Sequence, residues 1–158
     1  MARNIEVLIQ QAGPESVLVE LQMHGDPRCL ALIRRLIGAS ATSIAITGLV
    51  LNDIKLAVTE ACTNVIKHAY KYDNTRKFEL KLLVSPYLFQ VRISYNDPGF
   101  DPSTIPVPDL TRIQEGGFGV FIMRQIMDDV FYHADSTSGA VELRLVKILD
   151  TVLTNSGG

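Results

Sequence analysis

The chain has 158 residues and a net charge of −2, and 47% of its residues are hydrophobic while 20% are charged. This length and composition are those of one globular domain that buries a core without disulfides or a structural metal. The near-neutral charge argues against nucleic-acid binding, and without an apolar run of signal-peptide or membrane-span length we expect a cytoplasmic protein that contacts no membrane.

The first part of the chain predicts a β-hairpin. Apolar and polar residues alternate from Ile5 to Ile9 and again from Val17 to Leu21. Ala12 to Glu15 contain glycine and proline, which favour a turn between the two runs. We therefore expect two paired strands at the start of the domain.

A short helix is expected next. Asp26 supplies a capping oxygen and Pro27 fixes a helical φ, which are typical signals for a helix start. An apolar stripe follows and ends near Gly38, and we expect the weakly patterned residues 39–51 to form a connection.

The central element is a predicted helix from Asn52 to Tyr70. Its apolar residues recur at spacings of three and four, which places them on one stripe that faces the core. Asn52 and Asp53 offer side-chain oxygens to the unpaired N–H groups of the first turn. We expect this helix to position the functional residues.

A polar stripe follows the same helix. It contains a carboxylate, an amide and two cations, with a histidine beside them: Glu60, Asn64, Lys67, Lys71 and His68. A solvated helix face has the same character, so the spacing alone does not identify a site. An amide oxygen such as that of Asn64 is also a suitable ligand for Mg²⁺ with a nucleotide phosphate. Glu60, one turn earlier, can orient or deprotonate a hydroxyl that attacks the terminal phosphate.

A second hairpin and a long loop follow the central helix. Apolar residues alternate over 78–84 and over 89–95, which predicts two strands joined by a turn at Ser85 and Pro86. Residues 96–115 show no period and contain four of the seven prolines of the chain. Long loops in compact domains are commonly functional or disordered.

Glycines open the last predicted helix, which covers residues 120–129. Gly116, Gly117 and Gly119 precede or begin it, and an anion can approach helix N–H groups closely where side chains are absent. A turn that requires positive φ explains such glycines equally well. The strands expected after this helix cover 130–132 and 140–147.

These elements predict an α+β domain over residues 1–150, followed by a flexible tail at 151–158. Most of the strands are joined by hairpins and interleaved with helices. This order favours a two-layer α/β sandwich with a mixed, mostly antiparallel sheet and helices on one face.

Three blocks of the sequence resemble the anti-sigma factor serine kinases, which are relatives of the GHKL ATPases and of histidine-kinase catalytic domains. Residues 59–70, TEACTNVIKHAY, are similar to the N box of that family. Residues 95–102, YNDPGFDP, are similar to its first glycine box, and residues 115–130, EGGFGVFIMRQIMDDV, to its second. The resemblance follows the order and length of nearly the whole chain and implies a Bergerat-type ATP-binding fold.

The resemblance also implies a role for each site residue. Glu60 would be the catalytic base, Asn64 the Mg²⁺ ligand, and Lys67 or His68 would lie near phosphate. The remaining expected nucleotide-binding residues are Asp97, Gly99, Gly117 and Gly119, and residues 96–115 would be the ATP lid.

The function implied by the resemblance is that of an ATP- and Mg²⁺-dependent serine kinase that regulates transcription by partner switching. Such a protein sequesters a sigma factor and phosphorylates an anti-sigma antagonist, and the family also suggests a homodimer. The sequence departs from the family at the adenine site, where Tyr95 replaces an aspartate, Asp97 takes a glycine position and Ala140 replaces a common threonine. The alternative is a protein-binding module on the same fold that has lost nucleotide recognition.

Overall fold

Five antiparallel strands form one sheet in the computed structural model, which describes residues 4–112 and 117–149. Their order across the sheet is β1 (Val17–His24), β2 (Lys77–Val84), β3 (Leu88–Asn96), β5 (Ala140–Ile148) and β4 (Asp129–Ala134). All four pairings are antiparallel, so the mostly antiparallel sheet expected from the sequence is antiparallel throughout the described residues.

The predicted second hairpin is confirmed as β2 and β3. Their register pairs Glu79 with Ser94 at one end and Val84 with Phe89 at the other. In the turn, the Ser85 hydroxyl oxygen accepts hydrogen bonds from the N–H groups of Tyr87 and Leu88, both at 3.2 Å. Because side chains alternate between the two faces of a strand, the alternating apolar residues all reach the same core.

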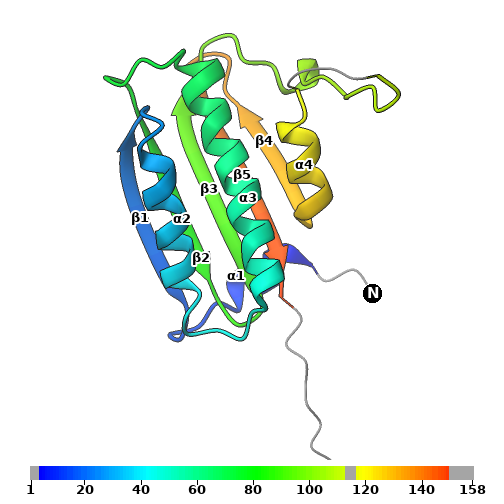
Figure 1. The fold of residues 1–158 in the computed structure, drawn as a ribbon. Coiled ribbons are helices and arrows are strands. Elements are labelled where there is room, and N and C mark those ends of the chain that lie inside the picture. The colour runs from blue at the N-terminus through cyan, green and yellow to red at the C-terminus, as the bar shows by residue number, and fades with distance from the viewer. Residues whose placement is uncertain (1–3, 113–116, 150–158) are drawn as a thin grey trace, which may run out of the picture.

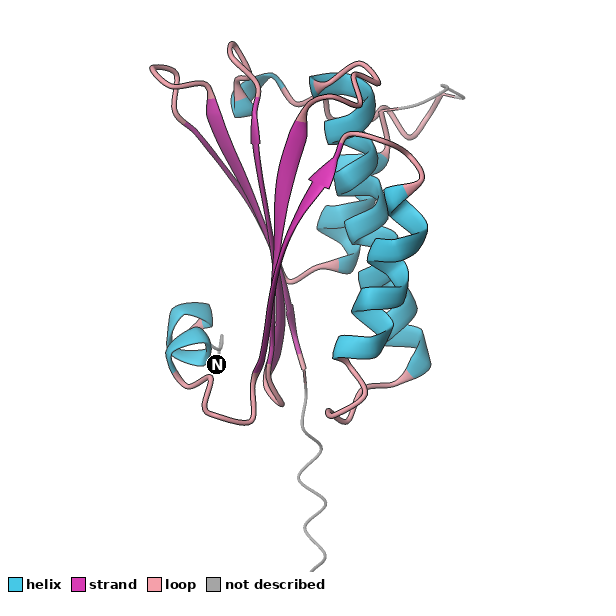
Figure 2. Ribbon diagram, turned by 90° about the vertical axis from the view of Figure 1, so that its left-hand side faces the viewer, coloured by secondary structure: helices cyan, strands magenta, loops and turns pink. Residues whose placement is uncertain are grey.

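Three helices cover one face of the sheet, as Figures 1 and 2 show: α2 (Cys29–Ser40), α3 (Gly48–Asn64) and α4 (Gly119–Ile126). Helix α3 lies between the other two. Fully buried aliphatic side chains fill the space between the layers, among them Ile33, Ile54, Leu80, Leu82, Ile93 and Leu143. Each such side chain stabilises the fold by about 1.5–3 kcal/mol relative to exposure, so α3 rests on a firm core.

The predicted first hairpin is wrong, because residues Ile5–Gln10 form helix α1. The Asn4 side chain caps it by accepting from the Glu6 N–H at 3.0 Å. Leu8 follows Ile5 by three positions, and these two pack with Ile9 on the face of the sheet opposite the other helices (Figure 2). The segment therefore buries the helical stripe Ile5, Leu8 and Ile9 rather than the alternating residues Ile5, Val7 and Ile9 of a strand. Val7 is accordingly 44% exposed.

The boundaries of the other helices differ from prediction for local reasons. Helix α3 begins four residues before Asn52, because Thr47 caps it. The Thr47 hydroxyl oxygen accepts from the Val50 N–H at 3.3 Å, and the expected caps Asn52 and Asp53 lie inside the helix. Gly38 lies inside α2 rather than after it, where an added Cβ would come 3.3 Å from Nζ of Lys55. Gly38 therefore lies beside the flexible end of the Lys55 side chain of α3.

Helix α4 ends at Ile126, before the predicted residue 129, and β4 already begins at Asp129. The strands β4 and β5 otherwise confirm the expected pair at the end of the domain. No helix in residues 4–112 and 117–149 has the length and apolar character needed to cross a membrane. The predicted tail at 151–158 lies outside the described residues.

Candidate functional site

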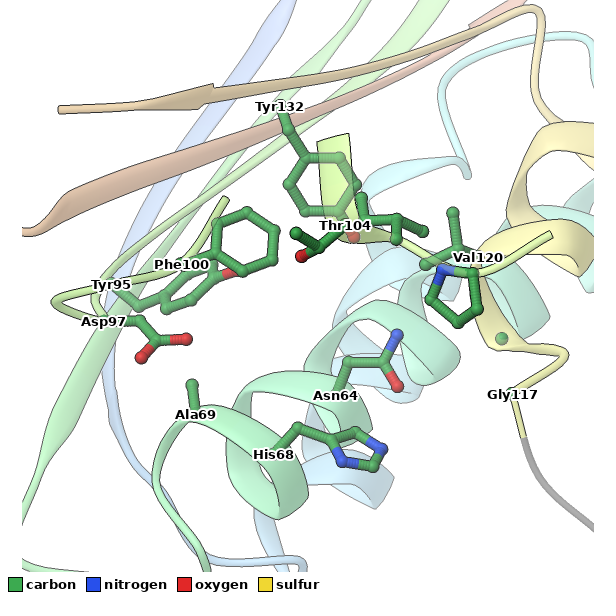
Figure 3. Close-up of a pocket in the computed structure, with 13 residues that line it drawn as sticks. Asn64, His68, Ala69, Tyr95, Asp97, Phe100, Thr104, Gly117, Val120 and Tyr132 are labelled. Carbon is green, nitrogen blue, oxygen red and sulfur yellow. The ribbon is translucent and has the colours of Figure 1, made fainter. Parts of the chain in front are cut away.

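A cavity of about 350 Å³ lies at one end of the sandwich. Figure 1 shows that the C-terminal ends of α3 and β3, the start of α4 and the long loop after β3 meet there. Two groups of residues face each other across it (Figure 3). We call Asn64, Gly117, Gly119 and Val120 the α4 end, and Ala69, Tyr95, Asp97, Phe100 and Tyr132 the β3 end.

The α4 end brings two of the sequence blocks into contact. A Cβ added to Gly119 would lie 3.0 Å from Oε2 of Glu60 and 3.3 Å from Nδ2 of Asn64. Only a residue without a side chain leaves both polar groups undisturbed at this distance. Gly117 has a φ of +77°, a left-handed conformation that glycine adopts without strain.

Glu60 lies behind the α4 end, since it is half-buried and does not itself line the cavity. Within the described part of the chain, no hydrogen bond or ion pair engages its carboxylate or the Asn64 amide. The first N–H groups of α4 have no partner within the helix. A carboxylate, an amide and a helix N-terminus therefore offer their polar groups at one place.

The helix changes geometry directly after Asn64. Residues Val65–Ala69 form a π-helical turn, in which the Tyr70 N–H donates to the carbonyl of Val65 at 2.8 Å. Such wide turns occur frequently at functional sites. Both His68 and Lys67 are exposed, but His68 lines the cavity, where it lies beside Asn64 in Figure 3, and Lys67 does not.

The predicted polar stripe therefore does not continue as a regular helix face beyond Asn64. Lys71 lies past the end of the helix, with a φ of 50°. An α-helical projection places Lys67 and Lys71 with Asn64, but the π-turn rotates the residues that follow it. Of the two residues expected near phosphate, His68 is the one at the cavity.

The β3 end combines aromatic rings with polar groups. The rings of Phe100 and Tyr132 are 5.5 Å apart, measured between centroids. Burial raises the pKa of the Tyr132 hydroxyl to about 12, and burial, with smaller contributions from Tyr132 and Asp97, also raises that of Tyr95. Both phenols are therefore protonated near neutral pH and can donate hydrogen bonds.

A glycine turn from the neighbouring strand pair holds the end of β3. The Asp97 N–H donates to the carbonyl of Gly139 at 2.8 Å, and Nδ2 of Asn96 donates to the carbonyl of Ser138 at 3.1 Å. Gly139 has a φ of +75°, and an added Cβ would come 2.9 Å from Cγ of Pro98. Gly99, with a φ of +88°, shapes the following turn but does not line the cavity.

The loop after β3 passes over the cavity through Thr104, Ile105 and Pro106. Its only regular structure among residues 97–112 is the 3₁₀ turn Pro102–Thr104, which Asp101 caps by accepting from the Ser103 N–H at 2.9 Å. Val107 is 84% exposed. Residues 113–115, the remainder of the predicted loop, fall outside the described residues, as does Gly116.

The structure thus gathers most of the residues selected from the sequence. Asn64, His68, Asp97, Gly117 and Gly119 line one cavity, and Glu60 touches its rear wall. Sequence reasoning missed the apolar and hydroxyl-bearing lining, namely Phe100, Thr104, Ile105, Val120 and Tyr132. Phe100 and Val120 lie within the quoted glycine blocks, but the place of Tyr132 depends on β4 pairing beside β5.

The chain is similar to a known domain family and to several named protein kinases. Residues 23–147 match the family described as the histidine kinase-like ATPase domain. The chain is 26% identical to the serine-protein kinase RsbW of Bacillus licheniformis, over 88% of this chain and 90% of that protein. It is 29% identical to RsbW of Bacillus subtilis, over 71% and 75% of the two chains, and 27% identical to RsbW of Listeria monocytogenes, over 81% and 87%.

A solved structure shares the fold. The crystal structure of the RsbU and RsbW domains of a Mycobacterium tuberculosis protein superposes with a TM-score of 0.60 at 10% identity. The match covers 84% of this chain and 32% of the crystallised one. Together, these similarities confirm the resemblance drawn from the three sequence blocks.

Proposed function

The chain belongs to the family of histidine kinase-like ATPase domains, and from this premise we propose that it is an ATP-dependent protein serine kinase. The observation that carries the proposal is the meeting of Glu60, Asn64 and Gly119 at the start of α4. A base, an oxygen ligand and an anion-binding helix start are the parts that phosphoryl transfer requires. The closeness of Glu60 and Asn64 to Gly119 supports this proposal.

The α4 end fits a magnesium–nucleotide phosphate group. The side-chain oxygen of Asn64 is a hard ligand of the kind that Mg²⁺ takes together with water and phosphate oxygens. Gly117 and Gly119 let phosphate oxygens approach the first N–H groups of α4, whose dipole favours negative charge. When bound, ATP supplies the phosphoryl group and Mg²⁺ neutralises charge that develops during its transfer.

Glu60 acts in this proposal as the base. Its carboxylate lies against Gly119 and next to Asn64, with no other described group to hold it. It would accept the proton of a serine hydroxyl as the hydroxyl oxygen bonds to the terminal phosphorus, while the bond from that phosphorus to the bridging oxygen breaks and ADP leaves. His68 lies at the same cavity wall and can donate a hydrogen bond to a phosphate oxygen.

The proposed partners are a sigma factor and an anti-sigma antagonist that carries the phosphorylated serine. This part rests on the similarity to serine-protein kinases named RsbW. Phosphorylation would change which partner the protein holds, and so regulate transcription by partner switching.

A second candidate function is a protein-binding module without nucleotide recognition. The composition of the β3 end favours it, because Tyr95 stands where the resembling family has an aspartate, and Ala140 does not line the cavity. Such a module would use the same fold to hold protein partners.

Calorimetric titration with ATP separates the two functions. The kinase should bind ATP with a heat that depends on Mg²⁺, and it should transfer radiolabelled phosphate to its cognate antagonist. Absence of both, with a folded protein and a verified partner, would favour the binding module. Titration with ADP under the same conditions serves as a control for binding without a transferable phosphate.

A further inference from the structure

Arg76 joins two segments that reach the cavity from different directions, although it does not line the cavity itself. Its guanidinium donates one hydrogen bond to the carbonyl of Ala69, at 3.1 Å, and another to the carbonyl of Asn96. Ala69 ends the π-helical turn and lines the cavity. Asn96 ends β3 between Tyr95 and Asp97, which both line it. One side chain therefore connects the helical segment of the site to its strand.

The ring of Tyr70 supports this guanidinium from one side. The central carbon of the guanidinium lies 4.0 Å from the ring centroid, which is a cation–π contact. The ring is itself fixed, since Tyr70 is buried and its hydroxyl donates to the carbonyl of Lys77 at 2.6 Å. A Cβ added to Gly25 would come 2.8 Å from Cδ2 of Tyr70, so the ring packs directly against this glycine. The stack therefore limits the directions in which Arg76 can point.

The backbone of Arg76 is held as well. Its carbonyl accepts from the N–H of Gly25, the first residue after β1, at 2.9 Å. Its N–H donates to the carbonyl of Asp73 at 3.3 Å. The Asp73 carboxylate accepts from the N–H and the hydroxyl of Thr75, at 3.0 and 2.6 Å. The connection between the π-turn and β2 is therefore a supported base for the Arg76 side chain.

Strained backbone lies directly before this base. Lys71 and Tyr72 have φ values of 50° and 63°, a left-handed conformation that residues with side chains seldom adopt. Such conformations persist where the surrounding contacts impose them. Here the Tyr72 N–H donates to the carbonyl of Ile66 at 2.8 Å, and Arg76 holds the carbonyl of Ala69. The contacts at this junction are therefore strong enough to keep two strained residues in place.

Arginine suits this position better than lysine does. A planar guanidinium presents several N–H donors in a fixed geometry and stacks on an aromatic ring. An ammonium group at the end of a flexible chain cannot reproduce both carbonyl contacts together with the stack. The positive charge also lies at the end of a helical segment, where carbonyls without a helix partner favour a cation.

We propose that Arg76 is a positioning residue of the nucleotide site, which fixes the spacing between the α4 end and the β3 end of the cavity. This inference rests on the proposed function, in which the phosphates of ATP bind at the α4 end and its nucleoside lies toward the β3 end. A ligand that contacts both ends gains affinity when they are held at the right spacing, because less freedom is lost on binding. A ligand that contacts one end gains nothing from that spacing.

Ligands of different reach test the proposal. Mg-ATP contacts both ends, inorganic triphosphate with Mg²⁺ offers only the phosphate part, and adenosine offers only the nucleoside part. Their dissociation constants are measured by calorimetry, or by amide chemical shifts for weak ligands, with the wild type, Arg76→Lys and Arg76→Gln. Arg35→Lys is the matched control, because Arg35 is exposed on α2 and does not line the cavity.

The Arg76 variants should lose affinity selectively. We expect both to weaken Mg-ATP by about tenfold, or ~1.4 kcal/mol of lost preorganisation, and to change the binding of triphosphate and of adenosine by less than about twofold. A residue that served only the fold would lower the melting temperature and weaken all three ligands alike, or weaken none. Arg35→Lys should bind all three as the wild type does.

Hydrogen exchange in the wild type tests the same arrangement without relying on a variant that folds. The Tyr70 N–H donates to the carbonyl of Val65 and the Asp97 N–H to that of Gly139, both at 2.8 Å. Because the junction is held before a ligand binds, both amides should exchange without nucleotide within about tenfold of an amide in the middle of β3, such as that of Val91. Much faster exchange at either amide would show an open junction and overturn the inference.

The outcomes separate this inference from the proposed function. If the wild type binds neither Mg-ATP nor triphosphate, the proposed function fails and the inference fails with it. If the wild type binds Mg-ATP but Arg76→Lys keeps its full affinity, or loses affinity for all three ligands alike, the nucleotide site stands and the positioning role is overturned. A loss confined to Mg-ATP, absent from Arg35→Lys, supports that role.

Discussion

The two ends of the cavity use different kinds of group. The α4 end depends on the absence of side chains at Gly117 and Gly119 and on backbone N–H groups, with Asn64 and Glu60 as its polar side chains. The β3 end depends on side chains such as those of Tyr95 and Asp97, at a strand end whose backbone is held by Arg76 and Gly139. A side chain added at Gly119 would therefore displace neighbouring polar groups, whereas a substitution at Tyr95 or Asp97 changes a side chain on a backbone that other residues hold.

This difference explains how the chain departs from the resembling family at one end only. The quoted N box and second glycine box meet at Gly119. The first glycine box carries the departures, and its backbone is nevertheless held by Arg76 and Gly139. We therefore expect a changed side chain at this strand end to leave the fold intact.

The largest expected effect is on phosphoryl transfer by Glu60→Gln. The substitution keeps the size of the side chain but removes its basic carboxylate, and base catalysis contributes roughly 10²–10⁴-fold in rate. Radiolabelled phosphate transfer to a cognate antagonist should fall by about that factor, while ATP affinity changes far less. Glu79→Gln, on an exposed position of β2, is the control and should transfer at the wild-type rate. Equal rates for wild type and Glu60→Gln would remove Glu60 from the mechanism.

Removal of the proposed metal ligand should have the next largest effect. We expect Asn64→Ala to raise the dissociation constant of Mg-ATP by about tenfold or more, a change of at least ~1.4 kcal/mol. The fold should persist because the side chain makes no described hydrogen bond. Asn52→Ala, exposed on the same helix, should bind as the wild type does. An unchanged affinity in folded Asn64→Ala would contradict the assignment.

The loop over the cavity should respond to nucleotide. Residues 104–112 have few regular backbone partners, so we expect their amides to exchange hydrogen faster than those of the sheet. At an ATP concentration ten times the dissociation constant, exchange of the amides over the cavity should slow by about tenfold, the factor set by mass action. Amides at residues 85–88, at the opposite end of β3, are the internal reference. Identical exchange with and without ATP would argue against a lid.

The sequence predicted correctly those elements whose apolar spacing fits a strand or a helix but not both. Strands β2 and β3 and helix α2 follow from apolar periodicity, and Ile33 lies fully buried on the predicted stripe. Residues 5–9 carry both an alternating and a helical pattern, and only the contact of Leu8 with Leu88 and Val146 decides between them. Local sequence does not contain that contact.

The residues of the candidate site that are defined by their chemical type could be predicted from the sequence. The residues that reach the cavity only through the folding of distant segments could not. Glu60, Asn64 and Gly119 are recognisable because their chemistry requires those residues. The π-turn that brings His68 rather than Lys67 to the cavity has no signal in the periodicity. The place of Tyr132 follows from the sheet order, which pairs β4 with β5 and not with the strand before it in the chain.

The smallest expected effect compares two glycines at the starts of helices. Gly48 begins α3 and an added Cβ there meets nothing within 4 Å, whereas at Gly119 it would come 3.0 Å from Oε2 of Glu60. Alanine in place of glycine stabilises a compatible helical position by about 0.4–1 kcal/mol, by limiting the unfolded chain. Gly48→Ala should therefore raise the melting temperature without changing ATP affinity.

Gly119→Ala should do the opposite. The gain from limiting the unfolded chain is offset because Glu60 must move, and the methyl group narrows the approach of phosphate to the helix start. We expect its melting temperature to stay near that of the wild type and its ATP affinity to fall about three- to tenfold, or roughly 0.6–1.4 kcal/mol. Thermal unfolding and calorimetry on both variants decide the matter. Equal affinities would show that Gly119 serves only the packing of α4 and α3, and that the α4 end is no more constrained than the β3 end.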